Sequence, residues 1–273
     1  MRLFLIRHGE SVDNAAGVYA GSRDSGLTAH GALQTRRLAS SLAQSCAITH
    51  ILSSPLQRAA KTAGAVCDAQ NQVHGATGLT VTLVPELREK DFGSLEGVSF
   101  RHGKPNCPDA ETAQCVRERV CRFWDEHMLP LLHDEAGTKT DTKCAVVAHG
   151  ILLRALASLL CENLSTNTAF PPGPERNGLA ADSPNSEFLS WSNTGYLEVY
   201  MSKRPSAPSG SASSHCDVRL TLWHLRIERV NCVSHLDNLK KTRGGIGSAP
   251  FDDSQRTIER FFSSEPKPRT NGS

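Results

Sequence analysis

Two short apolar runs, each followed by a histidine and a glycine, constrain the fold of this chain more than any other feature. The first occupies residues 3–6 and leads into Arg7 and His8, and the second occupies residues 144–148 and leads into His149. Runs this short favour buried strands over helices. Ligands of parallel α/β sheets bind beyond the carboxyl ends of the strands. We therefore expect both histidines at the ligand-binding edge of one sheet.

The chemistry of the first strand end suggests phosphoryl transfer. A neutral imidazole such as that of His8 is a competent nucleophile, and an adjacent guanidinium such as that of Arg7 can bind a phosphate or carboxylate through two hydrogen bonds. The Arg-His-Gly tripeptide alone is a weak signal, because it recurs at residues 101–103 in a polar segment without a preceding apolar run. The functional hypothesis therefore needs support from other parts of the chain.

The composition limits the classes of partner and cofactor. The 273 residues fit one large domain or two small ones, and 38% apolar with 5% aromatic residues suggests that part of the length is not packed. A net charge of +2 gives no reason to expect nucleic acid or an anionic membrane as partner. Nine cysteines without a Cys-x-x-Cys pair favour free thiols over a disulfide or zinc framework.

The same features predict a location inside the cell. Free thiols fit a reducing compartment, and no apolar run approaches the ~20 residues of a membrane-spanning helix. The predicted strand begins at residue 2, which leaves no room for a signal peptide. We expect a cytoplasmic protein, with a nuclear location left open as the alternative.

The segment between the two strand ends predicts a second arginine at the same edge of the sheet. After a Gly- and Ser-rich loop, Thr28 is a candidate N-cap for a helix that returns the chain to a strand at residues 48–52. That strand ends in Ser-Ser-Pro at residues 53–55, which we interpret as a serine cap followed by proline in the first helical turn. Arg58 then projects from the start of this helix.

The middle of the chain supplies candidate acids. Residues 68–78 read as a polar loop, residues 80–84 as a strand and residues 109–132 as a long helix with Trp124 in the core. Four acids follow the strand, and reasoning from the residues alone does not choose among them; they are Glu86, Glu89, Asp91 and Glu96.

The last third of the chain predicts two strands and a tail. Residues 192–200 and 217–229 alternate in polarity and suggest an antiparallel pair. The composition predicts loop inserts near 163–190 and 202–216. We predict one domain over residues 1–230 and an extended or partly disordered tail over 231–273.

The ordered motifs resemble those of the histidine phosphatase superfamily, which also contains the cofactor-dependent phosphoglycerate mutases. The resemblance covers about residues 1–230 and is specific only in combination. The matching motifs are Arg7-His8-Gly9-Glu10-Ser11 with Asn14, Leu27-Thr28 with Gly31 and Gln34, Ser53-Ser54-Pro55-Leu56 with Arg58, Ala59 and Thr62, Leu87-Arg88-Glu89 with Phe92-Gly93 and Glu96-Gly97, Val147-Ala148-His149-Gly150, and Asn193-Thr194-Gly195.

The resemblance implies a three-layer α/β/α sandwich with a mostly parallel central sheet. It implies that His8 accepts the phosphoryl group and that Arg7, Arg58 and His149 bind the phosphate oxygens. Asn14 matches a further phosphate contact. Glu89 matches the acid that protonates the leaving oxygen and then activates water. The family uses neither a metal nor another cofactor in this reaction, and the expected partner is a small-molecule phosphate ester or another phosphorylated substrate.

Departures from the mutase pattern favour a phosphatase. Val12 and Asp13 come after the first motif where mutases usually carry an aromatic residue, and residues 97–109 are short where mutases insert a longer segment. Residues 89–93 also lack the mutase arginine and tyrosine ahead of the glycine. The secreted acid phosphatase branch fits less well, because Glu10 and Ser11 stand where that branch has arginine and proline.

Two alternatives stay open. One is a cofactor-dependent phosphoglycerate mutase. The other is a non-enzymatic module that binds phospho-ligands or proteins through the basic tail around Lys240, Lys241 and Arg243. The sequence specifies neither the physiological substrate nor the oligomeric state.

Overall fold

A mixed six-stranded sheet forms the centre of the part of the chain that the structure describes. The computed structural model describes residues 1–75, 78–100, 107–135, 142–162, 191–203, 223–241 and 246–252. The strand order is β3-β2-β4-β1-β5-β6. The first four strands are parallel to one another, β5 is antiparallel to β1, and β6 is antiparallel to β5. The strands are β1 (Arg2–Arg7), β2 (His50–Ser53), β3 (Val81–Leu83), β4 (Lys143–Ala148), β5 (Tyr196–Lys203) and β6 (Trp223–Cys232).

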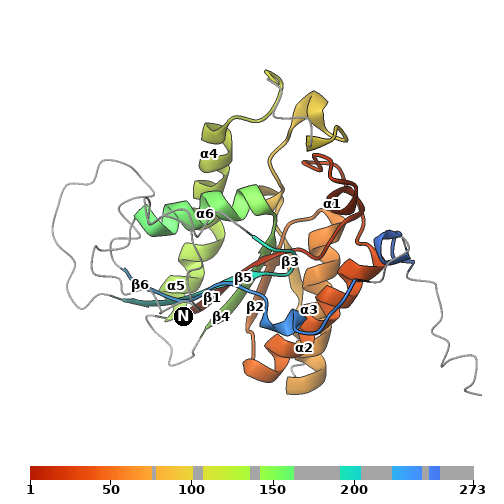
Figure 1. Cartoon of the computed structure of the whole chain (residues 1–273). Coiled ribbons are helices and arrows are strands. Elements are labelled where there is room, and N and C mark those ends of the chain that lie inside the picture. Colours follow the sequence, from red (N-terminus) through yellow and green to blue (C-terminus); the bar gives the residue numbers. More distant parts are fainter. Residues whose placement is uncertain are drawn as a thin grey trace, which may run out of the picture.

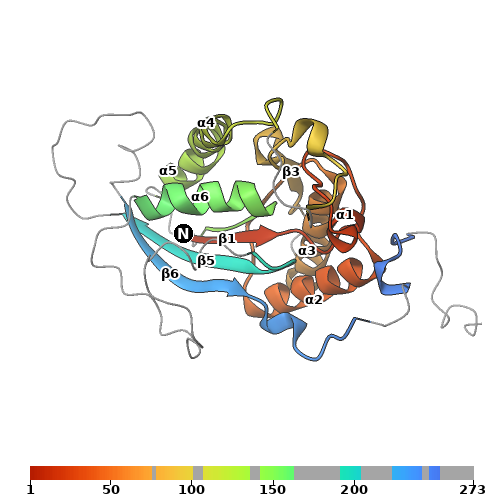
Figure 2. The same ribbon diagram turned by 45° about the horizontal axis from the view of Figure 1, so that its top comes forward.

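Helices cover both faces of this sheet, which confirms the predicted three-layer α/β/α class. α2 and α3 lie on one side, and α4, α5 and α6 lie on the other (Figures 1 and 2). No helix among the described residues is long and apolar enough to span a membrane. The helices are α1 (Val12–Ala16), α2 (Ala29–Ser45), α3 (Gln57–His74), α4 (Ala113–Phe123), α5 (Leu129–Glu135) and α6 (Gly150–Glu162).

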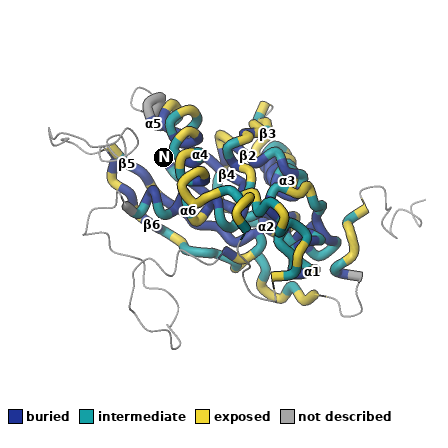
Figure 3. The backbone as a smooth tube through the Cα atoms, turned by 90° about the horizontal axis from the view of Figure 1, so that it is seen from above, coloured by how far each residue is buried: buried dark blue, intermediate teal, exposed yellow. Residues whose placement is uncertain are grey.

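Alternation along β1 explains why the first apolar run is continuous. Leu3 and Leu5 belong to the core cluster that includes α4 and α6 residues, whereas Phe4 and Ile6 belong to the cluster that includes α2 and α3 residues. A strand covered by helices on both faces is apolar at every position. β1 and β4 are accordingly buried over most of their length, and β4 lies among the dark blue segments in the middle of Figure 3.

The predicted polar loop at residues 68–78 is wrong for residues 68–74, because α3 continues to His74. The helix ends at Gly75, which adopts the left-handed conformation with φ 62°. One of its polar residues is part of the core: the buried Gln70 side chain accepts a hydrogen bond from Ile48 N and donates one to Cys46 O. A polar side chain that bonds to neighbouring backbone groups can therefore occupy a buried helix position. The periodic apolar pattern on which a helix prediction depends is then interrupted.

The predicted serine cap of α3 is also wrong, although the helix does place Arg58 in its first turn. The N-cap residue is Leu56, which makes no side-chain capping bond. The predicted Thr28 cap of α2 is confirmed by its hydrogen bond from Gly31 N.

The predicted helix over residues 109–132 consists of three consecutive pieces. It starts at Ala113, capped by Thr112, passes through a π-helical turn (Trp124–Met128) and continues as α5. Trp124 is fully buried, as predicted.

The last described segments pack on α2 rather than extending away from it. The predicted strand pair is confirmed as β5 and β6, although β5 starts only at Tyr196 and residues 217–222 lie outside the described residues. Beyond β6, Arg37 Nη1 donates to Asp237 O at 2.7 Å and Phe251 N to Leu27 O at 2.9 Å. The predicted inserts at 163–190 and, apart from the end of β5, at 202–216 also lie outside the described residues, and the domain boundary at 230 stays a prediction.

Candidate active site

His8 lies at the carboxyl end of β1 with one ring nitrogen already occupied. Its backbone N donates to Ala148 O at 3.1 Å and its carbonyl accepts from Thr194 N at 3.2 Å. Its Nδ1 lies 2.6 Å from Gly9 O. Because a carbonyl oxygen only accepts, Nδ1 carries the proton and Nε2 keeps its lone pair. A side chain at Gly9 would lie 2.7 Å from Gly31 O, so only glycine permits this close approach of α2.

The electrostatic environment keeps the His8 imidazole neutral. His8 is 3% exposed, and its burial, followed by the positive charges of Arg58 and Arg7, holds the pKa of His8 well below its usual range. The hydrogen bond to Gly9 opposes this effect only partly. Neutral imidazole is the nucleophilic form, so this environment favours nucleophilic chemistry at physiological pH.

The guanidinium groups of the half-buried Arg7 and the buried Arg58 lie beside His8 and are held by backbone oxygens. Arg7 donates through Nη1 to Trp191 O, and Arg58 donates to Gly21 O at 2.8 Å and to Arg23 O at 2.6 Å. In the described part of the chain, the Nε atoms of both arginines are buried without a hydrogen-bond partner. Burial lowers both pKa values, and the carboxylate of Glu89 opposes that shift. Buried cations with unused donors form an anion-binding site.

These groups line a pocket of about 560 Å³ at the carboxyl edge of the sheet. Among the described residues, the lining combines a cationic part, with Arg7, Arg58 and Arg154, and one acidic side chain, that of Glu89. The lining residues are Arg7, His8, Asn14, Val18, Tyr19, Ala20, Gly21, Arg58, Glu89, Phe92, Phe100, Gly150, Ile151, Arg154 and Trp191.

Asn14 lies in the pocket with its amide oxygen occupied. The side-chain Oδ1 accepts from Ser11 N at 3.3 Å and from Asn193 Nδ2 at 3.1 Å. Asn193 also donates to His8 O at 3.2 Å, so one amide joins the His8 backbone to Asn14. With Oδ1 occupied, the Nδ2 amino group of Asn14 is the donor available to an anion in the pocket.

The carboxylate of Glu89 is held at the start of α6. Its Oε2 accepts from Ile151 N and its Oε1 from Leu152 N, both at 3.1 Å, and Oε1 also accepts from Lys90 N at 2.9 Å. Helix N-termini favour negative charge through their free N–H groups. The helix that follows His149 therefore provides the binding site for the Glu89 carboxylate.

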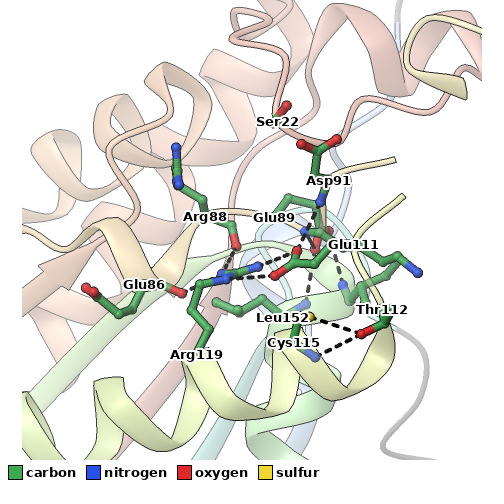
Figure 4. Close-up of polar contacts among 12 residues, drawn as sticks. Ser22, Glu86, Arg88, Glu89, Asp91, Glu111, Thr112, Cys115, Arg119 and Leu152 are labelled. Carbon is green, nitrogen blue, oxygen red and sulfur yellow. Dashed lines mark hydrogen bonds and ion pairs between the residues drawn. The ribbon is translucent and has the colours of Figure 1, made fainter. Parts of the chain in front are cut away.

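Arg119 and Glu111 hold the segment that carries this acid from the other side (Figure 4). Arg119 Nη1 donates to both Glu86 O and Arg88 O at 2.6 Å, and its other nitrogens bind the Glu111 carboxylate at 2.8 and 3.1 Å. Glu111 in turn makes two hydrogen bonds with Asp91. Its side-chain Oε2 accepts from Asp91 N at 3.1 Å, and its backbone N donates to Asp91 O at 2.9 Å. The pair thus fixes the main chain on both sides of the acid.

The other three candidate acids do not line the pocket. The Glu96 carboxylate accepts from Ser22 N and Ser22 Oγ, and Asp91 Oδ1 accepts from Gly93 N at 2.7 Å. Glu86 contributes its carbonyl to Arg119. Among the four acids, geometry therefore singles out Glu89, whose catalytic role stays a prediction.

His149 lies behind His8 instead of in the pocket lining. The two ring centroids are 5.0 Å apart, and His149 is fully buried. Its Nε2 lies 2.8 Å from Ser54 Oγ, while its Nδ1 is buried with no hydrogen-bond partner in the described part of the chain. Burial, followed by the charges of His8, Arg58 and Arg7, lowers the pKa of His149 well below its usual range. The predicted phosphate contact of His149 stays a prediction.

The residues that orient the site are not predicted from the sequence. Ser54 has the pattern of a helix cap, and Asn193 is only one member of a late motif. Trp191 and Gly21 contribute carbonyl oxygens, which leave no signature in the sequence. The second Arg-His-Gly tripeptide, at residues 101–103, lies outside the described residues. In the part of the chain that the structure describes, no group of three or more His, Cys, Asp or Glu could hold a metal ion.

Comparison with known proteins identifies the family. The model of the histidine phosphatase superfamily (branch 1) matches residues 3–171. This chain belongs to the histidine phosphatase superfamily. The matched range includes Arg7, His8, Arg58, Glu89 and His149, the candidate residues of the sequence motifs.

Relatives in this superfamily carry names of both reaction types. A probable phosphatase of Schizosaccharomyces pombe is 30% identical over 271 residues, covering 95% of this chain and 79% of the relative. A probable phosphoglycerate mutase of Yersinia enterocolitica is 42% identical over 192 residues, covering 64% of this chain and 79% of the relative. Sequence similarity alone therefore does not choose between the two reactions.

Solved structures share the fold of this chain. A mycobacterial glucosyl-3-phosphoglycerate phosphatase in complex with VO3 superposes with a TM-score of 0.59 at 21% identity, covering 84% of this chain and 98% of that one. An Entamoeba histolytica phosphoserine phosphatase in complex with 3-phosphoglyceric acid gives 0.55 at 20% identity, covering 86% and 98%. At these identities the comparison establishes the fold, and the predicted α/β class is confirmed.

Proposed function

We propose that the protein is a metal-independent phosphomonoesterase that works through a phosphohistidine on His8. In the first step His8 Nε2 bonds to phosphorus, the ester O–P bond breaks, and Glu89 gives its proton to the leaving alkoxide. In the second step Glu89 takes a proton from water, the water oxygen bonds to phosphorus, and the N–P bond breaks. The products are an alcohol and inorganic phosphate.

One observation carries this proposal: the tautomer of His8. Its Nδ1 proton is held by Gly9 O, so the unprotonated Nε2 belongs to a residue that lines the pocket with Arg7 and Arg58. Those guanidinium groups would neutralise the charge that spreads over the phosphoryl oxygens in the transition state. The Nε atoms of both guanidinium groups are buried without a hydrogen-bond partner in the described part of the chain, which leaves donors for an anion beside His8.

The proposal is tested with purified protein in EDTA, using p-nitrophenyl phosphate as substrate. We expect steady release of phosphate and an acid-labile phosphoenzyme in quenched samples. His8→Ala should abolish both, while the control His50→Ala, an exposed histidine at the start of β2, should retain both. Activity of His8→Ala at the wild-type rate would refute the nucleophile, and no hydrolysis by the folded wild type would favour a non-enzymatic module.

The similarity to a probable phosphoglycerate mutase makes isomerisation the second candidate. A mutase must hold the phosphoenzyme against water and bind the substrate carboxylate. Among the described residues that line this pocket, Arg154 is the one cation beyond Arg7 and Arg58. Incubation with 3-phosphoglycerate and a bisphosphoglycerate primer separates the two reactions: we expect release of phosphate to exceed isomerisation, and the reverse would assign a mutase.

A further inference from the structure

One wall of the pocket is aromatic, and phosphate chemistry gives no reason for it. Tyr19, Phe92 and Phe100 all line the pocket. The ring of Tyr19 lies 4.8 Å from that of Phe92 in a tilted arrangement and 5.8 Å from that of Phe100 in an edge-to-face arrangement, measured between centroids. The three rings form one continuous cluster, which we call the aromatic wall.

Backbone hydrogen bonds fix the aromatic wall in place. Residues 17–19 pair with residues 97–100: Tyr19 N donates to Val98 O at 2.9 Å, Gly97 N to Tyr19 O at 2.8 Å and Phe100 N to Gly17 O at 3.2 Å. The Glu96 carboxylate also accepts from Phe92 N at 3.3 Å. The wall is therefore preorganised, and a ligand that stacks on it would pay little to order it.

Packing alone does not account for the wall. Phe100 is 49% exposed, and its neighbour Val98 is 44% exposed, whereas the core residue Trp124 is fully buried. Apolar surface left open in a pocket marks a contact with a ligand. Tyr19 and Phe92 are likewise only half-buried, although each has an aromatic neighbour.

The size of the pocket agrees with a bulky, apolar ligand group. About 560 Å³ lies in the range of pockets that hold drug-sized ligands, well beyond the needs of a phosphoryl group. The hydroxyl groups of a small polyol phosphate would lose hydrogen bonds to water against the aromatic wall without replacement. A flat apolar ring would instead bury its faces against Tyr19 and Phe100.

We propose that the preferred substrate is a small-molecule phosphate monoester whose alcohol carries an aromatic ring close to the ester oxygen. The phosphoryl group lies between Arg7, Arg58 and His8, and the ring stacks against the aromatic wall. This inference rests on the proposed phosphomonoesterase function and names its substrate class. Tyr19, Phe92 and Phe100 are then the specificity-determining residues.

The experiment compares esters that release alcohols of similar leaving ability. The wild-type protein is assayed with 2-phenylethyl phosphate, 2-cyclohexylethyl phosphate, propyl phosphate and 3-phosphoglycerate, and kcat/KM is measured for each. We expect 2-phenylethyl phosphate to exceed propyl phosphate by about tenfold, mainly through KM, because one or two ring contacts contribute this much. The cyclohexyl ester, apolar but not flat, should lie between them.

Substitutions in the wall test whether it is the cause of the preference. Phe100→Ala should reduce the ratio of kcat/KM for phenylethyl over propyl phosphate to about twofold, and Phe100→Leu should give an intermediate ratio. Val73→Ala, an exposed apolar residue on α3, is the matched control and should leave the ratio at its wild-type value.

The outcomes separate this inference from the function on which it rests. Hydrolysis of all esters at similar kcat/KM would overturn the aromatic preference and leave the phosphatase assignment intact. An aromatic preference that Phe100→Ala does not reduce, with Phe92→Ala equally ineffective, would overturn the role of the wall. No hydrolysis of any ester would overturn the proposed function and this inference together.

Discussion

The ends of β1 and β4 have the same local pattern and orient their histidines differently. Both are buried parallel strands paired in register, and each is followed by histidine and glycine. At the end of β1 the Nδ1 of His8 is occupied and the residue lines the pocket. At the end of β4 the Nε2 of His149 is bound to Ser54 and the ring lies behind His8.

The difference arises from the path of the chain after each glycine. Gly9 is followed within a few residues by the short α1, and its carbonyl oxygen lies 2.6 Å from Nδ1 of the preceding ring. Gly150 begins α6, whose first turn binds the carboxylate of Glu89 instead. The role of a histidine at a strand end therefore depends on which of its ring nitrogens has no hydrogen-bond partner. The short sequence pattern does not show which nitrogen that is.

The largest expected effect is a difference in kcat between variants of His8 and variants of His149. His8→Gln should lower kcat by at least ~10⁴-fold and remove the phosphoenzyme, because the nucleophile is lost. His149→Gln should lower kcat by about 10²-fold, the typical cost of one transition-state donor, and should still form phosphoenzyme in quenched samples. Phosphoenzyme on His8→Gln, or none on His149→Gln, would reverse the two roles.

Substitution of Glu89, whose carboxylate is bound at the start of α6, tests its proposed role in proton transfer. Glu89→Gln should lower kcat/KM for an alkyl phosphate by roughly 10²- to 10⁴-fold, the usual range for a general acid. The loss should be much smaller for p-nitrophenyl phosphate, whose leaving group needs little protonation. Equal losses on both substrates, measured in parallel, would assign Glu89 a structural role. Glu86→Gln is the matched control, since Glu86 does not line the pocket.

The two buried histidines predict a loss of stability in mild acid. Their folded-state pKa values are lowered by burial and by nearby arginines, whereas an unfolded histidine titrates near 6.5. Below about pH 6.5 the unfolded chain binds more protons, so the free energy of unfolding should fall as pH drops, by up to about 1.4 kcal/mol per pH unit for each histidine. Urea unfolding at pH 7, 6 and 5 measures this slope.

Variants assign that slope to particular residues. His8→Asn and His149→Asn should each make the free energy of unfolding less dependent on pH. The control is the exposed His50→Asn, which should leave the slope unchanged. An unchanged slope in both buried variants would show that other groups control the acid sensitivity.

Arg119 tests whether the backbone around Glu89 must be held. Arg119→Met removes the bonds to Glu86 O and Arg88 O and should lower kcat on an alkyl phosphate by about tenfold, since a displaced acid transfers its proton less well. As for Glu89→Gln, the loss should shrink with p-nitrophenyl phosphate. Arg122→Met, exposed on the same helix, should match wild type. A leaving-group-independent loss would indicate general destabilisation.

The smallest effect concerns the orientation of His149. Ser54→Ala removes the bond to Nε2 and should lower kcat by about fivefold, near the ~1 kcal/mol of one hydrogen bond. Ser53→Ala is a neighbouring control, because Ser53 Oγ donates to the carbonyl of Ser54 instead of binding the His149 ring. Equal activities of the two variants would contradict the positioning of His149 by Ser54.

The sequence predicts the sheet and the pocket residues better than the hydrogen bonds that hold those residues in place. Apolar runs ending in charged or polar residues locate β1 and β4, and a proline-marked helix start locates Arg58, because strand ends and helix starts converge at one edge of a parallel sheet. The carbonyl oxygens that hold Arg58 and the backbone contacts of Arg119 are not predictable, since any residue can offer a carbonyl. The role of Ser54 is ambiguous in sequence because the same hydroxyl can cap a helix or bind a ring.

The packing of the last described segments on the first loop has a consequence for synthesis of the chain. Lys241 Nζ lies 2.9 and 3.0 Å from the carboxylate of Glu10, across 231 residues, and the β1 strand pairs with β4 and β5, which are made much later. Contacts this distant in sequence close late. During synthesis, the segment that carries His8 therefore gains these contacts only after β4, β5 and Lys241 have been made.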